Sequence, residues 1–329
     1  MQTLLARLRP RSAFGTPPKG DSLFGQLCWA ARHRFGASRL AELLAGYTEG
    51  APFVVVSDAL PAGHLPRPAL PGHWFEMDAT EDRKAVKKRR WLPLDRADEP
   101  LAAWLRHCVD DAELLRSQPG EQQAADEPPR FVATHPQPHN SLSRATGTTG
   151  RGAFAPYQME QHWYAPGAEL DLWLVHDPDR IGRDDLALLL ADMGAFGFGR
   201  DASIGLGKFD LVAVDAATLP AQPGADAWLT LAPCTPQGLA WDAARCFYQP
   251  FTRFGRHGDL AVQSGRPFKN PVLLAQTGAL LAPPEFTSRA FIGQGLGGDG
   301  VLSRAISATV HQGYAPVVAV ALPAREAAA

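Results

Sequence analysis

Apolar and polar residues alternate along residues 3–9, and a period of two predicts a strand with one buried face. The apolar side of this strand would hold Leu4, Ala6 and Leu8, and the other side would hold Arg7 and Arg9. We therefore expect an N-terminal strand with a core-facing side and a cationic outer side.

Other segments have the helical period, with apolar residues every three or four positions. The first runs to Phe35, and Asp21 or Ser22 can cap its start. Further helices are expected at 38–45 and 183–194. Strands are expected at 52–57, 154–164, 168–176 and 208–214. Among the aromatic residues we expect core positions for Phe24, Trp29 and Phe35, and strand packing for Trp163 and Trp173.

The order strand, helix, strand occurs before residue 58 and again after residue 168, which predicts an α+β fold of ferredoxin-like type. Residues 58–150 are aperiodic and rich in proline and charge, so we expect an insertion there. After a linker at 215–226, strand-like pieces and a second glycine-rich loop predict a degenerate second copy of the fold, at 227–233, 245–251, 271–281, 291–300 and 306–321. The expected modules are residues 1–214 and residues 227–329.

The net charge of the 329-residue chain is −2, so no nucleic-acid affinity follows from its overall charge. The charge is unevenly distributed, however. Residues 1–41 contain seven Lys or Arg and one acid, and six of the eight residues at 83–90 are cationic. Any polyanion-binding function must therefore lie in local patches.

The four cysteines form no CxxC pair and have no metal-ligand spacing with histidine. We expect reduced thiols, no metal and no other cofactor. No apolar run approaches the roughly 20 residues of a membrane span. A cytoplasmic protein without membrane association is the expectation.

A glycine-rich segment follows the helix expected at 183–194 and leads into the next strand. Glycine lets the backbone adopt positive φ and approach another chain closely, and exposed N–H groups then suit phosphate oxygens. Phosphate loops of nucleotide-binding folds instead lie between a strand and the following helix. A long permissive turn is the alternative. The candidate RNA contacts here are Gly197, Phe198, Gly199, Arg200, Ser203, Gly205, Gly207 and Lys208.

The segment GFGRDASIGLGKF resembles the signature loop of the RAMP superfamily of CRISPR proteins. The runs KGDSLFGQLCWA, SDALPAGHLPRPALP, KKRRWLPL, HNSLSRATG and HQGYAPVV are similar to the Csm-type subunit of type III effector complexes, the one in the fourth Csm position. The resemblance covers most of the chain, although residues 95–130 match nothing.

This resemblance implies two ferredoxin-like, RRM-like modules that hold the repeat-derived 5′ handle of the guide RNA (crRNA). It also implies two protein partners, the Cas10-type large subunit and a backbone RAMP subunit, and a protruding β-hairpin thumb. The aperiodic residues 75–100, which contain the basic cluster, are the expected thumb.

Three further groups are candidate RNA contacts. The basic cluster suits phosphates, and an indole suits base stacking; its alternative is a solvated charged loop. The HNSLSR segment offers donors for phosphate and ribose, or forms an Asx or Ser turn. A second cationic wall near Arg256 and Arg266 is equally explained by scattered surface charge, and Tyr314 either stacks or packs. The candidates are Lys19, Arg83, Lys84, Lys87, Lys88, Arg89, Arg90, Trp91, His139, Asn140, Ser143, Arg144, Arg253 and Lys269.

No catalytic motif occurs among the ten histidines and the carboxylates. We therefore expect a binding protein without enzymatic activity. Two alternatives remain open: a metal-independent endoribonuclease that processes precursor crRNA, which needs an acid or base within reach of the phosphate, and a scaffold subunit whose RNA contacts are incidental.

Overall fold

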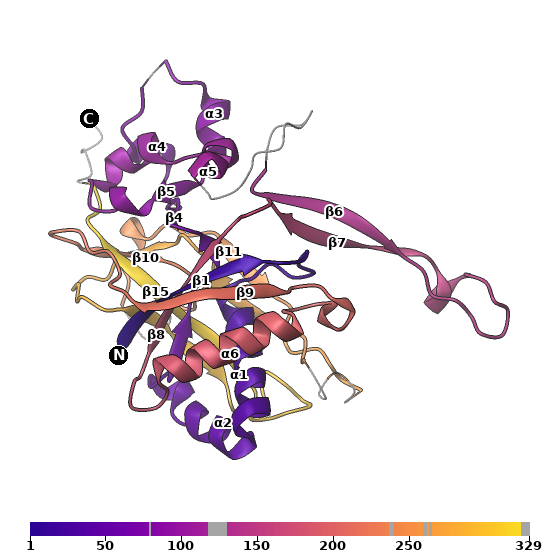
Figure 1. Cartoon of the computed structure of the whole chain (residues 1–329). Coiled ribbons are helices and arrows are strands. Elements are labelled where there is room, and N and C mark those ends of the chain that lie inside the picture. Colours follow the sequence, from indigo (N-terminus) through magenta and orange to yellow (C-terminus); the bar gives the residue numbers. More distant parts are fainter. Residues whose placement is uncertain (79, 118–129, 237–239, 259–261, 263–264, 324–329) are drawn as a thin grey trace.

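The computed structural model describes residues 1–323 apart from 79, 118–129, 237–239, 259–261 and 263–264 (Figure 1). Two antiparallel sheets, an insertion and a projecting hairpin make up the described chain. The first sheet has the strand order β2-β8-β1-β9, and a short strand β3 also pairs with β8. These strands are β1 (Gln2–Pro10), β2 (Val54–Val56), β3 (Leu60–Pro61), β8 (Leu170–His176) and β9 (Phe209–Ala216).

Helices α1 (Gly20–Phe35) and α6 (Arg183–Phe196) pack against each other on one face of this sheet, next to α2 (Ala37–Leu44) (Figure 1). The N-terminal strand is confirmed, with Leu4, Ala6 and Leu8 buried as the period of two predicted. The predicted helices are confirmed too.

The start of α1 differs from the expectation. Lys19 occupies the N-cap position without a side-chain cap, and neither Asp21 nor Ser22 caps the helix. The carboxylate of Asp58, which follows β2, accepts the Gly20 N–H at 2.8 Å instead. Asp21 is buried within the first turn because it forms an ion pair with a distant arginine, described below.

The second sheet has the order β13-β10-β15-β14. It is built from β10 (Ala227–Thr230), β13 (Leu280–Leu281), β14 (Phe291–Gly297) and β15 (Val310–Val320), and β11 (Pro250–Arg253) pairs with β12 (Val272–Ala275) in a separate ribbon. Within the described part of 227–323 there is no α-helix. The second sheet therefore has the strands expected of a second module but, among the described residues, none of its helices.

The prediction of a glycine-rich loop at 291–300 is wrong for the first seven of these residues, which form strand β14. Gly293 has φ +94°, and a Cβ there would lie 2.1 Å from the Gly313 carbonyl oxygen on β15. Glycine serves close strand pairing here, which the composition alone does not distinguish from a loop.

The insertion contains short elements and one long hairpin. Its elements are β4 (His64–Pro66), α3 (Arg83–Lys88), β5 (Trp91–Pro93), α4 (Trp104–His107), α5 (Asp111–Ser117), β6 (Val132–His139) and β7 (Tyr157–Tyr164), with 3-10 turns at Gly72–Trp74, Leu94–Arg96, Leu101–Ala103 and Gly152–Phe154. Further 3-10 turns lie outside the insertion, at Tyr47–Glu49, Ala202–Ile204 and Ala243–Arg245. Strands β6 and β7 project far from the body, whereas α3, α4 and α5 cluster at the top of the view (Figure 1).

The placement of a β-hairpin at 75–100 is therefore wrong. Residues 83–88 form α3, because the Asp82 side chain accepts the Lys84 N–H at the start of the helix and the Val86 side chain of the helix is buried. The projecting hairpin is 132–164 instead.

Apolar packing joins the sheets into one body. One core lies between the first sheet and its helices, and a second joins the insertion to β10, β13 and β15. Trp173 on β8 is buried in the second core, as expected for strand packing. The same expectation is wrong for Trp163, which is 49% exposed on the hairpin. Phe24 is fully buried, whereas Trp29 and Phe35 are half-buried.

Gln312 links the two sheets through the backbone of β2. Its side-chain amide accepts the Val56 N–H at 2.9 Å and donates to the Val56 carbonyl at 2.8 Å, and the residue is fully buried. Nearby, the Tyr314 hydroxyl donates to the Tyr47 carbonyl at 2.7 Å. Tyr314 therefore packs rather than stacks on a ligand.

Replacing Gln312 with Leu should lower the free energy of unfolding by roughly 3 kcal/mol, because a buried N–H and a buried C=O lose their partners together. Urea unfolding at unchanged m value measures this cost. Gln294→Leu, on the neighbouring strand β14, is the control and should cost far less. Equal losses in the two variants would contradict the linking role.

Candidate nucleic-acid interface

The base of the hairpin, the glycine-rich loop and residues 11–16 form one hydrogen-bonded unit. Phe14 and His162 exchange both backbone hydrogen bonds at 2.9 Å, which fixes residues 11–16 to β7. On the other side, the Gly207 N–H donates to the Ala13 carbonyl at 2.7 Å, and the Arg200 N–H donates to Thr16 Oγ1 at 3.0 Å. The loop and the hairpin are thus held in a fixed relation.

The loop itself is tightly folded. Gly207 has φ +71°, and its missing Cβ would lie 2.1 Å from the Phe198 carbonyl oxygen. Phe198 is buried and donates its N–H to the Gly207 carbonyl at 2.9 Å. Gly205 also has positive φ, but nothing lies within 4 Å of its missing Cβ. Packing of the loop on itself therefore requires glycine at 207, whether or not a ligand approaches.

Both cations of the loop have intramolecular partners. The Arg200 guanidinium donates to the Glu160 carbonyl on β7 and lies 3.4 Å from the Asp201 carboxylate. Lys208 Nζ donates to the Ala195 carbonyl in the last turn of α6 at 3.0 Å. The exposed residues of the loop are Gly199, Ser203, Ile204 and Lys208. Phosphate contact by Arg200 or Lys208 stays a prediction that has to compete with these bonds.

The HNSLSR segment lies at the far end of the hairpin, where β6 ends (Figure 1). The His139 ring stacks on Tyr157 across the strand pair, with centroids 5.2 Å apart and planes at 10°. Asn140 and Arg144 are exposed, and Ser143 accepts the Gly147 N–H through its backbone. The tip therefore presents polar donors to solvent on a stem with aromatic pairs.

The basic cluster is divided by its ion pairs. Arg89 pairs with Glu81 at 3.0 Å and Arg90 pairs with Asp111, while Trp91 is half-buried beneath Arg90. The remaining cations are exposed on or beside α3 and have no ion pair among the described residues: Arg83, Lys84, Lys87 and Lys88. Only part of the cluster is therefore available to an anion.

Lys19 and Arg253 lie near the start of α1, and both are close to one aromatic ring. Lys19 Nζ is 5.5 Å and the Arg253 guanidinium is 4.8 Å from the Phe251 centroid. Lys19 also pairs with Asp58 at 3.0 Å, and Arg253 forms a two-point pair with Asp21 at 2.6 and 2.8 Å. Both predicted RNA contacts therefore serve first to neutralise buried carboxylates.

Asp21 is the most deeply buried carboxylate of this group, with a fully covered side chain. Burial raises the pKa of Asp21, but contacts from His311 and Arg253 outweigh burial and hold that pKa well below its ordinary value. His311 Nε2 lies 3.4 Å from Asp21 Oδ2. Burial lowers the pKa of Lys269, which is half-buried next to this cluster.

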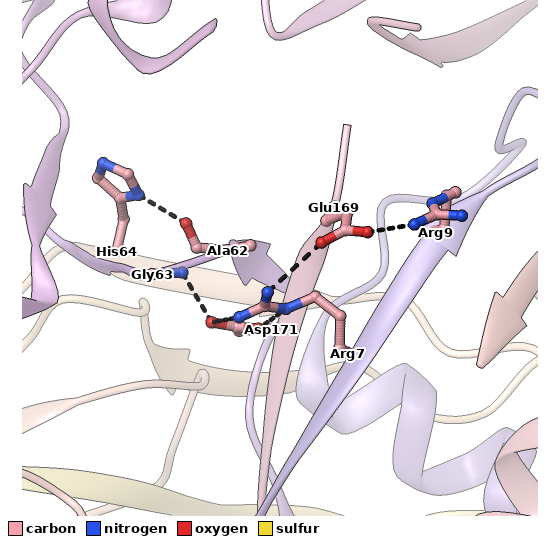
Figure 2. Close-up of polar contacts among 7 residues, drawn as sticks. All are labelled: Arg7, Arg9, Ala62, Gly63, His64, Glu169 and Asp171. Carbon is pink, nitrogen blue, oxygen red and sulfur yellow. Dashed lines mark hydrogen bonds and ion pairs between the residues drawn. The ribbon is translucent and has the colours of Figure 1, made fainter. Parts of the chain in front are cut away.

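The expected cationic side of β1 is neutralised by its neighbour β8. Arg7 Nε pairs with Asp171 at 2.7 Å, and Arg9 pairs with Glu169 at 2.6 Å (Figure 2). The Gly63 N–H donates to the second oxygen of Asp171 at 2.7 Å, which ties the insertion to this face. The outer side of β1 therefore carries the two expected arginines, but their charges are neutralised within the molecule.

His64, on the same face, donates its Nδ1–H to the Ala62 carbonyl oxygen at 2.8 Å (Figure 2). Burial lowers the pKa of His64, so the ring favours its neutral form. Burial also raises the pKa of Cys28 and of Cys234 to about 12, which favours their protonated thiol form. No group of three or more metal-ligating side chains occurs in the described part of the chain.

Sequence reasoning missed the two acids that organise this region. Asp58 lies in the SDALP segment and accepts hydrogen bonds from Gly20 and Thr277 as well as pairing with Lys19. Asp21 was assigned only a capping role. The signal that could have found them is the position of a carboxylate beside an otherwise apolar run, which in a folded chain demands a cation.

Among the described residues no helix is both long and apolar enough to cross a bilayer. No family model and no curated protein matches the sequence.

Solved structures match the fold over nearly the whole chain. A chain of a Csm1–Csm4 cassette in complex with pppApA has a TM-score of 0.55 at 18% identity, covering 98% of this chain and 99% of the other. A chain of the same cassette in complex with cA4 has a TM-score of 0.57 at 16% identity over 98% and 100%. A chain of the Csm3–Csm4 subcomplex of the type III-A CRISPR-Cas interference complex has a TM-score of 0.57 at 13% identity over 96% and 98%. The resemblance seen in the motifs is confirmed at the level of the fold.

Replacing Arg253 with Ala should lower the free energy of unfolding by about 3 kcal/mol or more, because Asp21 then stays buried and uncompensated. Urea unfolding of the purified chain measures this loss. Asp21→Asn combined with Arg253→Met should recover much of it. If Arg253→Ala unfolds like the wild type, the pair has no structural role.

The same pair predicts acid sensitivity. A folded-state pKa below the ordinary carboxyl value stabilises the fold above about pH 4, and this contribution is lost as the pH falls toward the folded-state pKa. Wild-type stability should therefore fall more steeply between pH 5 and pH 3 than that of Asp21→Asn. Glu285→Gln, at an exposed site, is the control and should keep the wild-type slope.

Ala substitutions at Gly207 and Gly205 separate packing from backbone strain. Gly205→Ala should cost about 1–2 kcal/mol, because positive φ disfavours a side chain. Gly207→Ala should cost roughly 2 kcal/mol more, because its Cβ also overlaps the Phe198 backbone. Urea unfolding compares the two; equal costs would refute the tight fold of the loop.

Proposed function

We propose that this chain is a non-catalytic RNA-binding subunit of a type III-A CRISPR-Cas interference complex that grips the repeat-derived 5′ handle of the crRNA. The observation that carries the proposal is the fold shared over nearly the full length with chains of the Csm1–Csm4 and Csm3–Csm4 structures. Those names support two partners, a Cas10-type large subunit and a backbone subunit, with this chain as the bridge between them.

The topology supports the details that the resemblance implied. The order β2-β8-β1-β9, with α1 after β1 and α6 after β8, is the arrangement of a ferredoxin-like module. The four-stranded second sheet is its degenerate copy, and the β6–β7 hairpin is the thumb. Its base is fixed to the glycine-rich loop, so that loop and thumb present a preformed surface to a strand of RNA.

The unpaired cations of α3 provide the phosphate-binding chemistry, since phosphate neutralisation dominates nucleic-acid affinity. The donors at the hairpin tip suit ribose and phosphate. Several histidines are instead committed to internal contacts, such as His176 with the Ile181 carbonyl and His257 with Ser303. This supports a binding role without catalysis.

The test is the salt dependence of binding between the full chain and a labelled single-stranded RNA that carries the 5′ handle. Contact with about five phosphates should give a slope of log K against log salt near −3.5. Lys87→Ala with Lys88→Ala should reduce its magnitude by about 1.4, since each lost phosphate contact removes about 0.7.

The control is Arg96→Ala with Arg106→Ala. These arginines are exposed in the same insertion but are paired with Glu99 and Glu76, and the change in net charge is the same. This control should keep the wild-type slope. A wild-type slope near zero, or equal binding of a scrambled RNA of the same composition, would overturn the proposal.

A further inference from the structure

The β11–β12 ribbon has two different faces, set by its antiparallel register. Arg253 lies opposite Val272 in the ladder, and further along the ribbon Arg256 is bridged to Phe268. The Lys269 N–H donates to the Gly255 carbonyl at 2.9 Å, which continues the pairing between these points. Since cross-strand partners share a face, alternate pairs lie on opposite sides of the ribbon.

The inner face is attached to the body of the molecule. Phe251 and Arg253 contact the start of α1 through Lys19 and Asp21, and the Lys269 stem lies over Gly255. The ribbon is also held at its far end, where buried His257 lies 2.7 Å from Ser303 Oγ. This face is fully used by internal contacts, so Arg253 and Lys269 serve as anchors.

The outer face carries large apolar side chains that touch little else. Phe254 is 76% exposed and Phe268 is 71% exposed, so neither ring belongs to a hydrophobic core. The Arg256 guanidinium lies 5.7 Å from the Phe268 centroid, so a cation accompanies the ring. An exposed face of this kind marks a contact surface.

Charge decides which occupant fits. Between residues 247 and 284 the sequence has four Lys or Arg and one acid, Asp259; with Arg253 and Lys269 on the inner face, Arg256 and Arg266 remain as the cations beside the exposed rings. Exposed aromatic rings interleaved with cations match single-stranded RNA, because bases stack on rings while cations neutralise the backbone. An apolar protein surface would have no use for this cationic excess.

We propose that the outer face of the β11–β12 ribbon is a base-stacking platform for single-stranded RNA, in which Phe254 and Phe268 each receive a base and Arg256 contacts the adjoining phosphate. This rests on the proposed RNA-binding function and adds a second contact, made to base faces on the second half of the chain. It also reassigns the RNA-facing side of the ribbon from Arg253 and Lys269 to the residues between them.

The experiment compares two fluorescein-labelled RNA strands of equal length, one with bases and one with an abasic ribose–phosphate backbone at the 3′ half, both bound to the full chain. Wild type should bind the base-bearing strand roughly 10-fold or more tightly than the abasic strand. Phe254→Leu with Phe268→Leu should remove that preference while leaving the affinity for the abasic strand unchanged. Leucine keeps the apolar area but removes the ring.

Controls separate this proposal from its foundation. Leu188→Ala, at an exposed apolar position on α6, should keep the base preference. Zero-length ultraviolet cross-linking followed by peptide mapping should place the RNA at Phe254 and Phe268, a readout independent of affinity. Because both rings are exposed, the double variant should unfold at the wild-type urea concentration.

Each outcome decides one question. If wild type binds neither strand, the proposed RNA-binding function fails and this platform with it. If wild type binds RNA but the double variant keeps the full base preference, the platform is refuted and the RNA-binding function stands. If the double variant keeps RNA affinity but no longer copurifies with the other subunits of its complex, the face docks a protein and the platform is likewise refuted.

Discussion

The burial of the Asp21 carboxylate is the constraint on which the arrangement of the molecule depends. A charge removed from water needs compensating charges at close range, and here they come from β11 and β15. Three segments distant in sequence, the first helix, the ribbon and the last long strand, therefore have to meet at one point. The neighbouring Asp58 repeats this logic with Lys19 and the start of the same helix.

Because many basic residues form internal ion pairs, their number in the sequence overstates the positive charge available to a ligand. Arg7 and Arg9, Arg89 and Arg90, and Arg253 all have carboxylate partners, so most of the cationic clusters visible in the sequence are structural. The near-neutral net charge reflects nearly equal numbers of acidic and basic residues, which makes such pairing possible. The cations left on α3 are few, and electrostatic attraction of a polyanion would concentrate on them.

The first sheet and its helices were predictable because local pattern and tertiary packing agree there. The period of residues 3–9 and the helical spacing after Asp21 each specify an element whose apolar side is buried in the fold. The ion pairs were not predictable, since the partners of Arg7, Asp171 and Glu169, lie 164 and 162 positions away. Strand β14 was mistaken for a loop because glycine at 293 serves close packing as readily as it serves a turn.

The hairpin was missed for a reason that lies in its prolines, since Pro136 and Pro138 argue against a strand. The fold accommodates these prolines because the N–H positions that they occupy point away from the partner strand. His162 turns its backbone groups outward, toward Phe14, so its partner Thr134 also points its N–H away from β7. Pro136 and Pro138 share the parity of Thr134, and no ladder bond is lost.

The same geometry has a consequence for the free edge of the hairpin. A projecting two-stranded ribbon offers a row of donors to any extended chain that meets it, which is a route to misassembly. Along β6 two consecutive outward positions carry no N–H at all. The β6 edge of the stem is therefore a poor template for a third strand, and contacts made along this edge have to depend on side chains more than on backbone hydrogen bonds.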